Sequence, residues 1–305
     1  MHTAPPPRLA LQETPLYWAW LMLSWLLQRL PLRVGYGLAW ICGSVAFICW
    51  PRGRRATLAN YRRLFPHATT GHLRQLGRAS LVNYCQYLVD FARAPMHDAA
   101  WFIRHCRGEA QFARLREVVD EGRGVIFVFM HFGNWDLGAA ATAARGFAPA
   151  VVVETFADPR LDRLVVGARE RLGMRPLRME ALRPSVVKHL RRGGVLALLI
   201  DRPAPGAGVP VTFFGRETAI PEGAARLALR TGARVVPAAC PRTRPWRPGV
   251  HVLADFDVET PHTGDETRDI RDLSQAIMDV HERFLRAYPE QWYMFREMWP
   301  RRGAA

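Results

Sequence analysis

Apolar runs alternate with amphipathic segments through the last two thirds of this chain, and this alternation restricts its possible folds more than any other feature. The runs are rich in β-branched and aromatic residues, which favours buried strands. We expect strands at 124–130, 151–156, 195–200, 235–240 and 250–258. We expect helices at 135–145, 159–172, 183–192, 222–231 and 265–287. Strands that alternate with helices form a sheet covered on both faces, so we predict an α/β fold with a mixed, mostly parallel β-sheet flanked by helices.

The N-terminal fifth of the chain contains two apolar runs without a charged residue, at 16–27 and 34–50. A bilayer-spanning helix needs about 20 apolar residues, so the first run is too short and the second is borderline. Both runs are rich in tryptophan and tyrosine, which concentrate at the headgroup level of membranes, and arginines flank them. We therefore predict that residues 14–55 form a membrane-seated helical hairpin, shallow or re-entrant, with room for one short span. A helix pair buried in the protein core is the alternative.

A long helix is predicted at 72–93, because its apolar residues recur at helical spacing and Pro95 follows it. The helical pattern gives way to the alternating pattern near residues 95–105. We therefore divide the chain into a helical, membrane-associated N-terminal region at residues 1–95 and an α/β domain at residues 96–305.

The formal net charge is +15, and almost all of the positive charge is arginine. Hydrophobic residues make up 49% of the chain, which excludes an intrinsically disordered protein. Such a basic excess indicates an anionic partner: nucleic acid, a membrane surface or a phosphorylated substrate. The arginines are spread along the chain, and no zinc-finger, RNP or helix-turn-helix signature is present, so we expect no nucleic acid partner. The tryptophan-rich N-terminus with arginines at its edges favours the cytoplasmic face of a bilayer.

Neither the cysteines nor the histidines have the spacing of a metal site. The five cysteines form no C-x-x-C pair and their number is odd, which indicates a reduced, cytosol-facing protein. His189, His251, His262 and His281 form no H-x-x-H or H-x-x-x-H pair, so we expect no metal.

His131 directly follows the apolar run at 124–130, in the segment H-F-G-N-W-D that ends at Asp136. Gly133-Asn134 is a turn signal, and the small residues after Asp136 start a helix. A histidine at a strand end faces a crevice, where it serves as a general base near neutral pH. The turn would bring Asp136 within hydrogen-bond reach of the imidazole, fixing its tautomer and stabilising the protonated ring. The alternative is a histidine with only a structural role in the core.

The segment H-F-G-N-W-D resembles the H-x-x-x-x-D/E signature of the lysophospholipid acyltransferase superfamily. Further segments, in the same order, are similar to the branch of lipid A late acyltransferases and mycobacterial phosphatidylinositol mannoside acyltransferases. These segments are A-R-E-R-L-G at 168–173, L-I-D-R at 199–202, G-V-P-V-T-F-F-G at 208–215, T-G-A-R-V-V-P at 231–237 and Y-P-E-Q-W-Y-M at 288–294. The resemblance covers essentially the whole chain and implies a glycerol-3-phosphate acyltransferase-like fold.

This resemblance implies an O-acyltransferase that moves a fatty acyl chain from acyl-CoA or acyl carrier protein to a hydroxyl of a glycolipid or lysophospholipid. It implies no cofactor and a place on the cytoplasmic face of the inner membrane. His131 would be the general base, and Asp136 would support it. The acceptor stays open between a lipid A type and a phosphatidylinositol mannoside type, because Asp201-Arg202-Pro203 differs from the corresponding segment of both groups.

The resemblance also implies how the developing oxyanion is stabilised, because such a charge needs preorganised donors. The backbone N–H groups near residues 133–135, around Asn134, are candidates. The guanidinium of Arg169 is another.

Four further residues are implied in substrate binding. Asp201 would position the acceptor hydroxyls, and Arg202 would bind a phosphate or support Asp201. Phe213 and Phe214 would line the acyl slot, unless they belong to the core.

Two other classes of function stay open. A lipid or acyl-thioester hydrolase would use water in place of the acceptor, although no G-x-S-x-G elbow is present. A non-enzymatic basic protein that binds membranes or nucleic acid is the other alternative.

Overall fold

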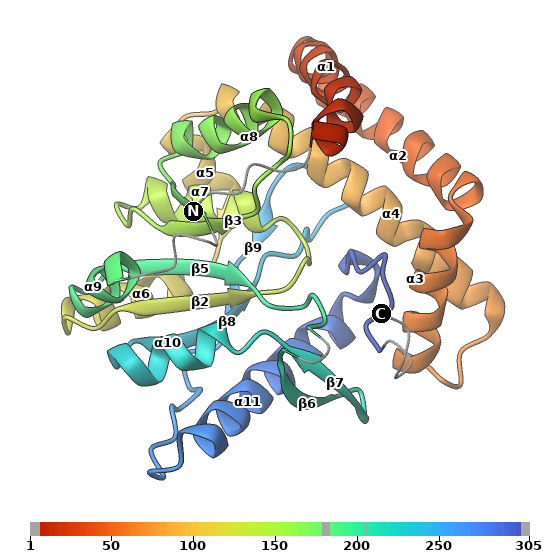
Figure 1. The fold of residues 1–305 in the computed structure, drawn as a ribbon. Helices are drawn as coiled ribbons and strands as arrows, with labels where there is room; N and C mark the ends of the chain where they lie inside the picture. Colours follow the sequence, from red (N-terminus) through yellow and green to blue (C-terminus); the bar gives the residue numbers. More distant parts are fainter. Residues whose placement is uncertain (1–6, 179–183, 205–206, 300–305) are drawn as a thin grey trace.

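The computed structural model describes residues 7–178, 184–204 and 207–299. Its centre is a six-stranded sheet of order β10-β8-β2-β5-β3-β4, in which β10 is antiparallel to β8 and all other neighbours are parallel. Figure 1 shows β8, β2, β5 and β3 side by side in the middle of this sheet. The strands are β2 (Val125–Phe129), β3 (Ala150–Val153), β4 (Arg175–Arg178), β5 (Val195–Leu199), β8 (Arg234–Ala239) and β10 (Leu253–Ala254). The predicted mostly parallel α/β fold is confirmed.

Helices cover both faces of this sheet because successive strand residues point to opposite sides. Ile126 and Val128 of β2 face a core shared with α9 (Pro184–Arg191), α10 (Gly223–Thr231) and α11 (Glu266–Ala287). Phe127 and Phe129 face a second core, shared with α5 (Ala99–His105), α6 (Glu109–Asp120) and α7 (Trp135–Ala144). The remaining helix of this part, α8 (Pro159–Arg171), connects β3 to β4.

Part of the strand structure differs from the prediction. The run at 250–258 is divided between β9 (Val250–His251), which pairs with β1 (Cys106–Arg107), and β10, which ends at Ala254. β6 (Val209–Phe213) and β7 (Arg216–Ile220) form an antiparallel hairpin that was not predicted. Its two-residue turn, Phe214-Gly215, has φ values of 50° and 70°, as type I′ hairpin turns require. The short strand β4 was not predicted either.

The N-terminal part is helical, as predicted. Its helices are α1 (Pro7–Arg29), α2 (Leu32–Cys49), α3 (Pro51–Leu64) and α4 (Thr70–Arg93). α2 packs along α4, and α1 packs against α4 and α8, so α4 lies between these two helices and the sheet (Figure 1). α4 begins where the Thr69 hydroxyl accepts a hydrogen bond from the His72 N–H.

Large apolar side chains are exposed along the outer faces of α1 and α2. They are Leu16, Trp18, Leu21, Met22, Leu23, Trp25, Leu26, Val34, Leu38, Trp40, Ile41, Val45 and Ile48. By length and apolar composition α2 could cross a bilayer, and only 28% of it is buried in the protein. This exposure contradicts the alternative of a helix pair buried in the core.

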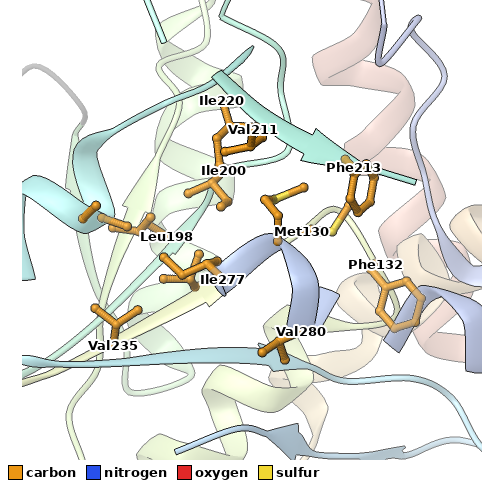
Figure 2. Packing of buried hydrophobic residues seen from close by; sticks show 14 of the residues in the cluster. Met130, Phe132, Leu198, Ile200, Val211, Phe213, Ile220, Val235, Ile277 and Val280 are labelled. Atoms are coloured by element: carbon orange, nitrogen blue, oxygen red, sulfur yellow. The ribbon is translucent and has the colours of Figure 1, made fainter. Parts of the chain in front are cut away.

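One core extends across residue 95, where we divided the chain. Tyr61 and Leu73, from α3 and α4, are buried together with Phe213 and Trp292. Figure 2 shows the same core around Met130, Val211 and Ile277. The division into two domains stays a prediction.

The start of α7 approaches the end of β8 so closely that two glycines are required. A Cβ atom on Gly138 would lie 2.3 Å from the Cys240 Sγ. A Cβ atom on Gly133 would lie 2.3 Å from the Cys240 carbonyl oxygen, and the φ of Gly133 is 65°. The first clash involves a side chain and the second involves backbone.

We predict that Gly138→Ala lowers the free energy of unfolding by about 1–3 kcal/mol through overpacking. Adding Cys240→Ala should restore part of this loss, because it removes the sulfur that the new methyl group would meet. Gly133→Ala is the matched control, and Cys240→Ala should not rescue it. Urea unfolding of the single and double variants measures the coupling; equal rescue of both glycine variants would contradict this packing.

Candidate active site

His131 and Asp201 meet because they occupy equivalent positions after two neighbouring parallel strands. Phe129 of β2 is paired with Leu199 of β5, and each strand is followed two residues later by the polar side chain. The His131 Nδ1 lies 2.6 Å from the Asp201 Oδ1. The His131 backbone N–H donates to the Asp201 Oδ2 at 3.0 Å.

Asp201 is fully buried, whereas 22% of the His131 side chain is exposed. The indole N–H of Trp292 also donates to Asp201, at 3.3 Å. Burial alone would raise the pKa of Asp201, but the contacts with His131 and Trp292 outweigh it and lower the pKa below its ordinary value. The carboxylate is therefore charged, and it holds the Nδ1 side of the imidazole while Nε2 is left for a reacting group.

Asp136 has other partners, which corrects our prediction that it would contact the imidazole. The Tyr87 hydroxyl donates to Asp136 at 2.7 Å, and Arg169 donates from Nε at 2.7 Å and from NH2 at 3.1 Å. Asp136 lies in the first turn of α7, from which its side chain reaches α4 and α8 instead of His131. Burial opposes the charge on Arg169, but Asp136 outweighs it and raises the pKa of the guanidinium.

The turn at 131–134 is fixed by backbone hydrogen bonds to two distant segments. Gly133 N–H donates to the Gln291 carbonyl at 3.0 Å, and Asn134 N–H donates to the Cys240 carbonyl at 2.8 Å. These two donors, which we predicted for the oxyanion, are therefore already used. The N–H of Trp135, at the first position of α7, has no acceptor among the described residues.

The side chain of Asn134 has a structural role here. Its carbonyl oxygen accepts from the Leu137 N–H at 3.1 Å and caps α7. Its amide donates to Asp90 at 3.0 Å. Asp90 also forms a buried ion pair with Arg242 and accepts from the Tyr36 hydroxyl at 2.5 Å. This network ties α2 and α4 to the turn at 131–134.

The remaining predicted residues lie in two places. Arg202 is partly exposed and forms an ion pair with Glu154. Burial and, after it, the positive charge of Arg296 lower the pKa of Arg202. Phe213 is fully buried and stacks on Trp299 at 5.8 Å, and Phe214 packs on Phe213 at 4.9 Å. Both phenylalanines are core residues in the structure.

Sequence reasoning missed Tyr87, Asp90 and Arg242, and it assigned Trp292 no role. Asp90 did leave a signal, because it is a lone acidic residue in the apolar stretch of α4.

The described part of the chain holds no group of three or more histidine, cysteine, aspartate or glutamate side chains that could bind a metal.

Comparison with known proteins agrees with the motif resemblance. The model of the family described as bacterial lipid A biosynthesis acyltransferase matches residues 6–301. A phosphatidylinositol mannoside acyltransferase of Mycolicibacterium smegmatis is 30% identical over 236 residues, which are 73% of this chain and 71% of the relative. A phosphatidylinositol mannoside acyltransferase of Mycobacterium tuberculosis is 28% identical over 227 residues, which are 72% of this chain and 69% of the relative.

We predict that Arg242→Met lowers the free energy of unfolding by about 3–5 kcal/mol, because it leaves Asp90 buried without its cation. The matched control is Arg226→Met, which breaks exposed ion pairs with Glu222 and Glu266 and should cost at most about 1 kcal/mol. Chemical unfolding of both variants measures the difference. Similar losses would show that the buried network does not hold the turn.

Proposed function

Since the chain belongs to the bacterial lipid A biosynthesis acyltransferase family and is therefore an acyltransferase, we propose that His131 and Asp201 carry out its chemistry. The substrates that we propose are an acyl thioester of CoA or acyl carrier protein and a hydroxyl of a glycolipid. The observation that carries this proposal is the contact between the imidazole and a fully buried carboxylate.

In this mechanism the Nε2 of His131 takes the proton from the acceptor hydroxyl while its oxygen attacks the thioester carbonyl carbon. Asp201 holds the Nδ1 proton and stabilises the imidazolium that forms. The tetrahedral intermediate then collapses, the carbon–sulfur bond breaks, and the thiolate takes the proton from the imidazolium. The products are an ester and a free thiol, and His131 is neutral again.

Asp136 has a supporting part in this proposal. Its bidentate contact with Arg169 and its hydrogen bond from Tyr87 hold the first turn of α7. That turn carries the Trp135 N–H, which we propose as a donor to the oxyanion. Arg169 then acts through Asp136 rather than on the substrate.

Arg202 is proposed to bind a phosphate of the donor or the acceptor. Arg202 and Arg296 are neighbouring cations, and an anion between them would relieve their repulsion. Phe213 and Phe214 are nearly completely buried. They would line an acyl slot only in a conformation in which this part of the core opens. The acceptor is proposed as a phosphatidylinositol mannoside type or a lipid A type, after the relatives and the family.

The outer faces of α1 and α2 are proposed to lie in the cytoplasmic leaflet of the inner membrane. Their exposed leucines, tryptophans and methionine gather on two consecutive helices, and an exposed apolar surface of this kind is typical of a membrane or partner contact. Arg29 stacks on Trp25 at 3.9 Å, which is suited to the headgroup level. A glycolipid acceptor could then reach the site without leaving the bilayer.

We predict that His131→Ala lowers acyl transfer by about 10²–10⁴-fold with the fold intact. Asp201→Asn should lower kcat within the same range, with little change in KM, because the imidazolium loses its charged partner. The assay is thiol release from acyl-CoA with and without glycolipid acceptor, with the lipid product identified by mass spectrometry. Asp272→Asn, on the exposed side of α11, is the matched control.

The same assay separates the alternatives. A fully active His131→Ala protein would contradict the mechanism. Thiol release that is equally fast without any acceptor would identify a hydrolase. Asp136→Asn should lower the free energy of unfolding, because it leaves Arg169 buried and unpaired, and this result would distinguish its role from that of Asp201.

We predict that the protein leaves membranes in detergent but not in high salt, because apolar burial is insensitive to ionic screening. The triple variant Trp18→Ser, Met22→Ser, Trp25→Ser should lower the membrane-bound fraction. The control is Ile103→Ser, an exposed apolar residue outside α1 and α2. Sedimentation of membranes followed by immunoblotting measures the distribution; release by salt alone would contradict this placement.

A further inference from the structure

A cavity of about 360 Å³ lies between α2, α4 and the segments at 242–246 and 288–291. It is separate from the proposed catalytic pair, because neither His131 nor Asp201 lines it. Arg78, Val82 and Gln86 are among the residues of α4 that line the cavity.

Gln86 provides a polar group in the cavity wall. Only 4% of this residue is exposed, and no hydrogen bond joins its amide to another described residue, but the amide is not among the polar atoms sealed from solvent. The amide is therefore open to the cavity, where a ligand can replace the water that solvates it. Its place in the cavity wall indicates a ligand with hydrogen-bonding groups.

Arg78 provides a cation at the same cavity. Its guanidinium lies over the Trp40 ring at 5.6 Å, and no carboxylate within the described ranges forms an ion pair with it. An arginine held by an aromatic ring, with its N–H donors left over, is suited to a phosphate oxygen.

Two exposed tryptophans belong to the cavity wall. Trp40 is 43% exposed and comes from α2, whose outer face is apolar. Trp246 is 44% exposed and has a φ of 62°. A bulky residue in the left-handed region is strained, and such strain is typical of ligand sites. Exposed indoles beside a membrane surface concentrate at the headgroup level.

We propose that this cavity binds the phosphate-bearing headgroup of a membrane lipid. This lipid is a ligand of the cavity and is not the acyl acceptor. The phosphate pairs with Arg78, a headgroup hydroxyl bonds with Gln86, and the acyl chains leave past Trp40 along α2. Glu290 in the wall favours a headgroup with hydroxyl donors, such as glycerol. The inference rests on the proposed membrane placement of α2.

The site adjoins the network that holds the turn at 131–134. Arg242 lines the cavity and also pairs with Asp90, which in turn accepts from Asn134. A bound headgroup would therefore contact the segment that keeps Arg242 in place.

The test is native mass spectrometry of the full chain in a non-ionic detergent, titrated with dioleoyl phosphatidylglycerol or dioleoyl phosphatidylcholine. We expect one tightly bound phosphatidylglycerol per chain. Arg78→Gln and Gln86→Leu should each weaken its binding about tenfold, as the loss of a hydrogen bond to a charged or buried partner does. Arg192→Gln, an exposed arginine after α9, is the matched charge control and should bind as the wild type does.

Three results would overturn the proposal. They are equal binding by the wild type and both cavity variants, displacement of the lipid by inorganic phosphate alone, and a sharp loss of thermal stability in Gln86→Leu, which would make the amide structural. Binding should persist in His131→Ala, which makes no acyl transfer. A wild type that binds the lipid but transfers no acyl group would thus refute the proposed function and leave this inference standing.

Discussion

The parallel pairing of β2 with β5 is the constraint on which the rest of the site depends. It places Phe129 beside Leu199, so the residues two positions later meet at the carboxyl ends of the strands. Asp201 is thereby buried completely. A buried carboxylate costs much free energy unless hydrogen-bond donors surround it. The imidazole and backbone of His131 and the indole of Trp292 supply these donors, and the segment that carries Trp292 must therefore pack against the turn at 131–134.

α4 connects the turn at 131–134 to the apolar surface of α1 and α2, which we propose to lie in the membrane. Tyr87 holds Asp136, Asp90 holds Asn134 and Arg242, and Gln86 lines the cavity assigned to a lipid headgroup. These residues lie within little more than one helical turn, so they point in different directions from one rigid element. A displacement of α2 relative to α4 would be transmitted to the first turn of α7 through these residues.

The sequence carried enough signal to predict the sheet, its helices and His131, because periodicity and turn chemistry are local. It failed at the hairpin of β6 and β7, which lies outside the main sheet and whose turn contains a phenylalanine at positive φ. It also paired His131 with Asp136, because nearness along the chain and the H-x-x-x-x-D/E signature both pointed to that residue. Tyr87 and Asp90 lie 49 and 44 residues from their partners Asp136 and Asn134, and no local pattern records such contacts.

The sequence by itself determined the α/β alternation, the family-specific segments and the apolar, tryptophan-rich faces of the first two helices, since each depends on residues that are neighbours along one strand or helix. Only the tertiary structure decided which carboxylate contacts the imidazole. Asp136 follows His131 closely but lies on a helix that directs it to Arg169. Asp201 is 70 residues away, and the register of two parallel strands brings it to 2.6 Å. Strand register is a long-range property, which is the physical reason that the pair could not be predicted from spacing.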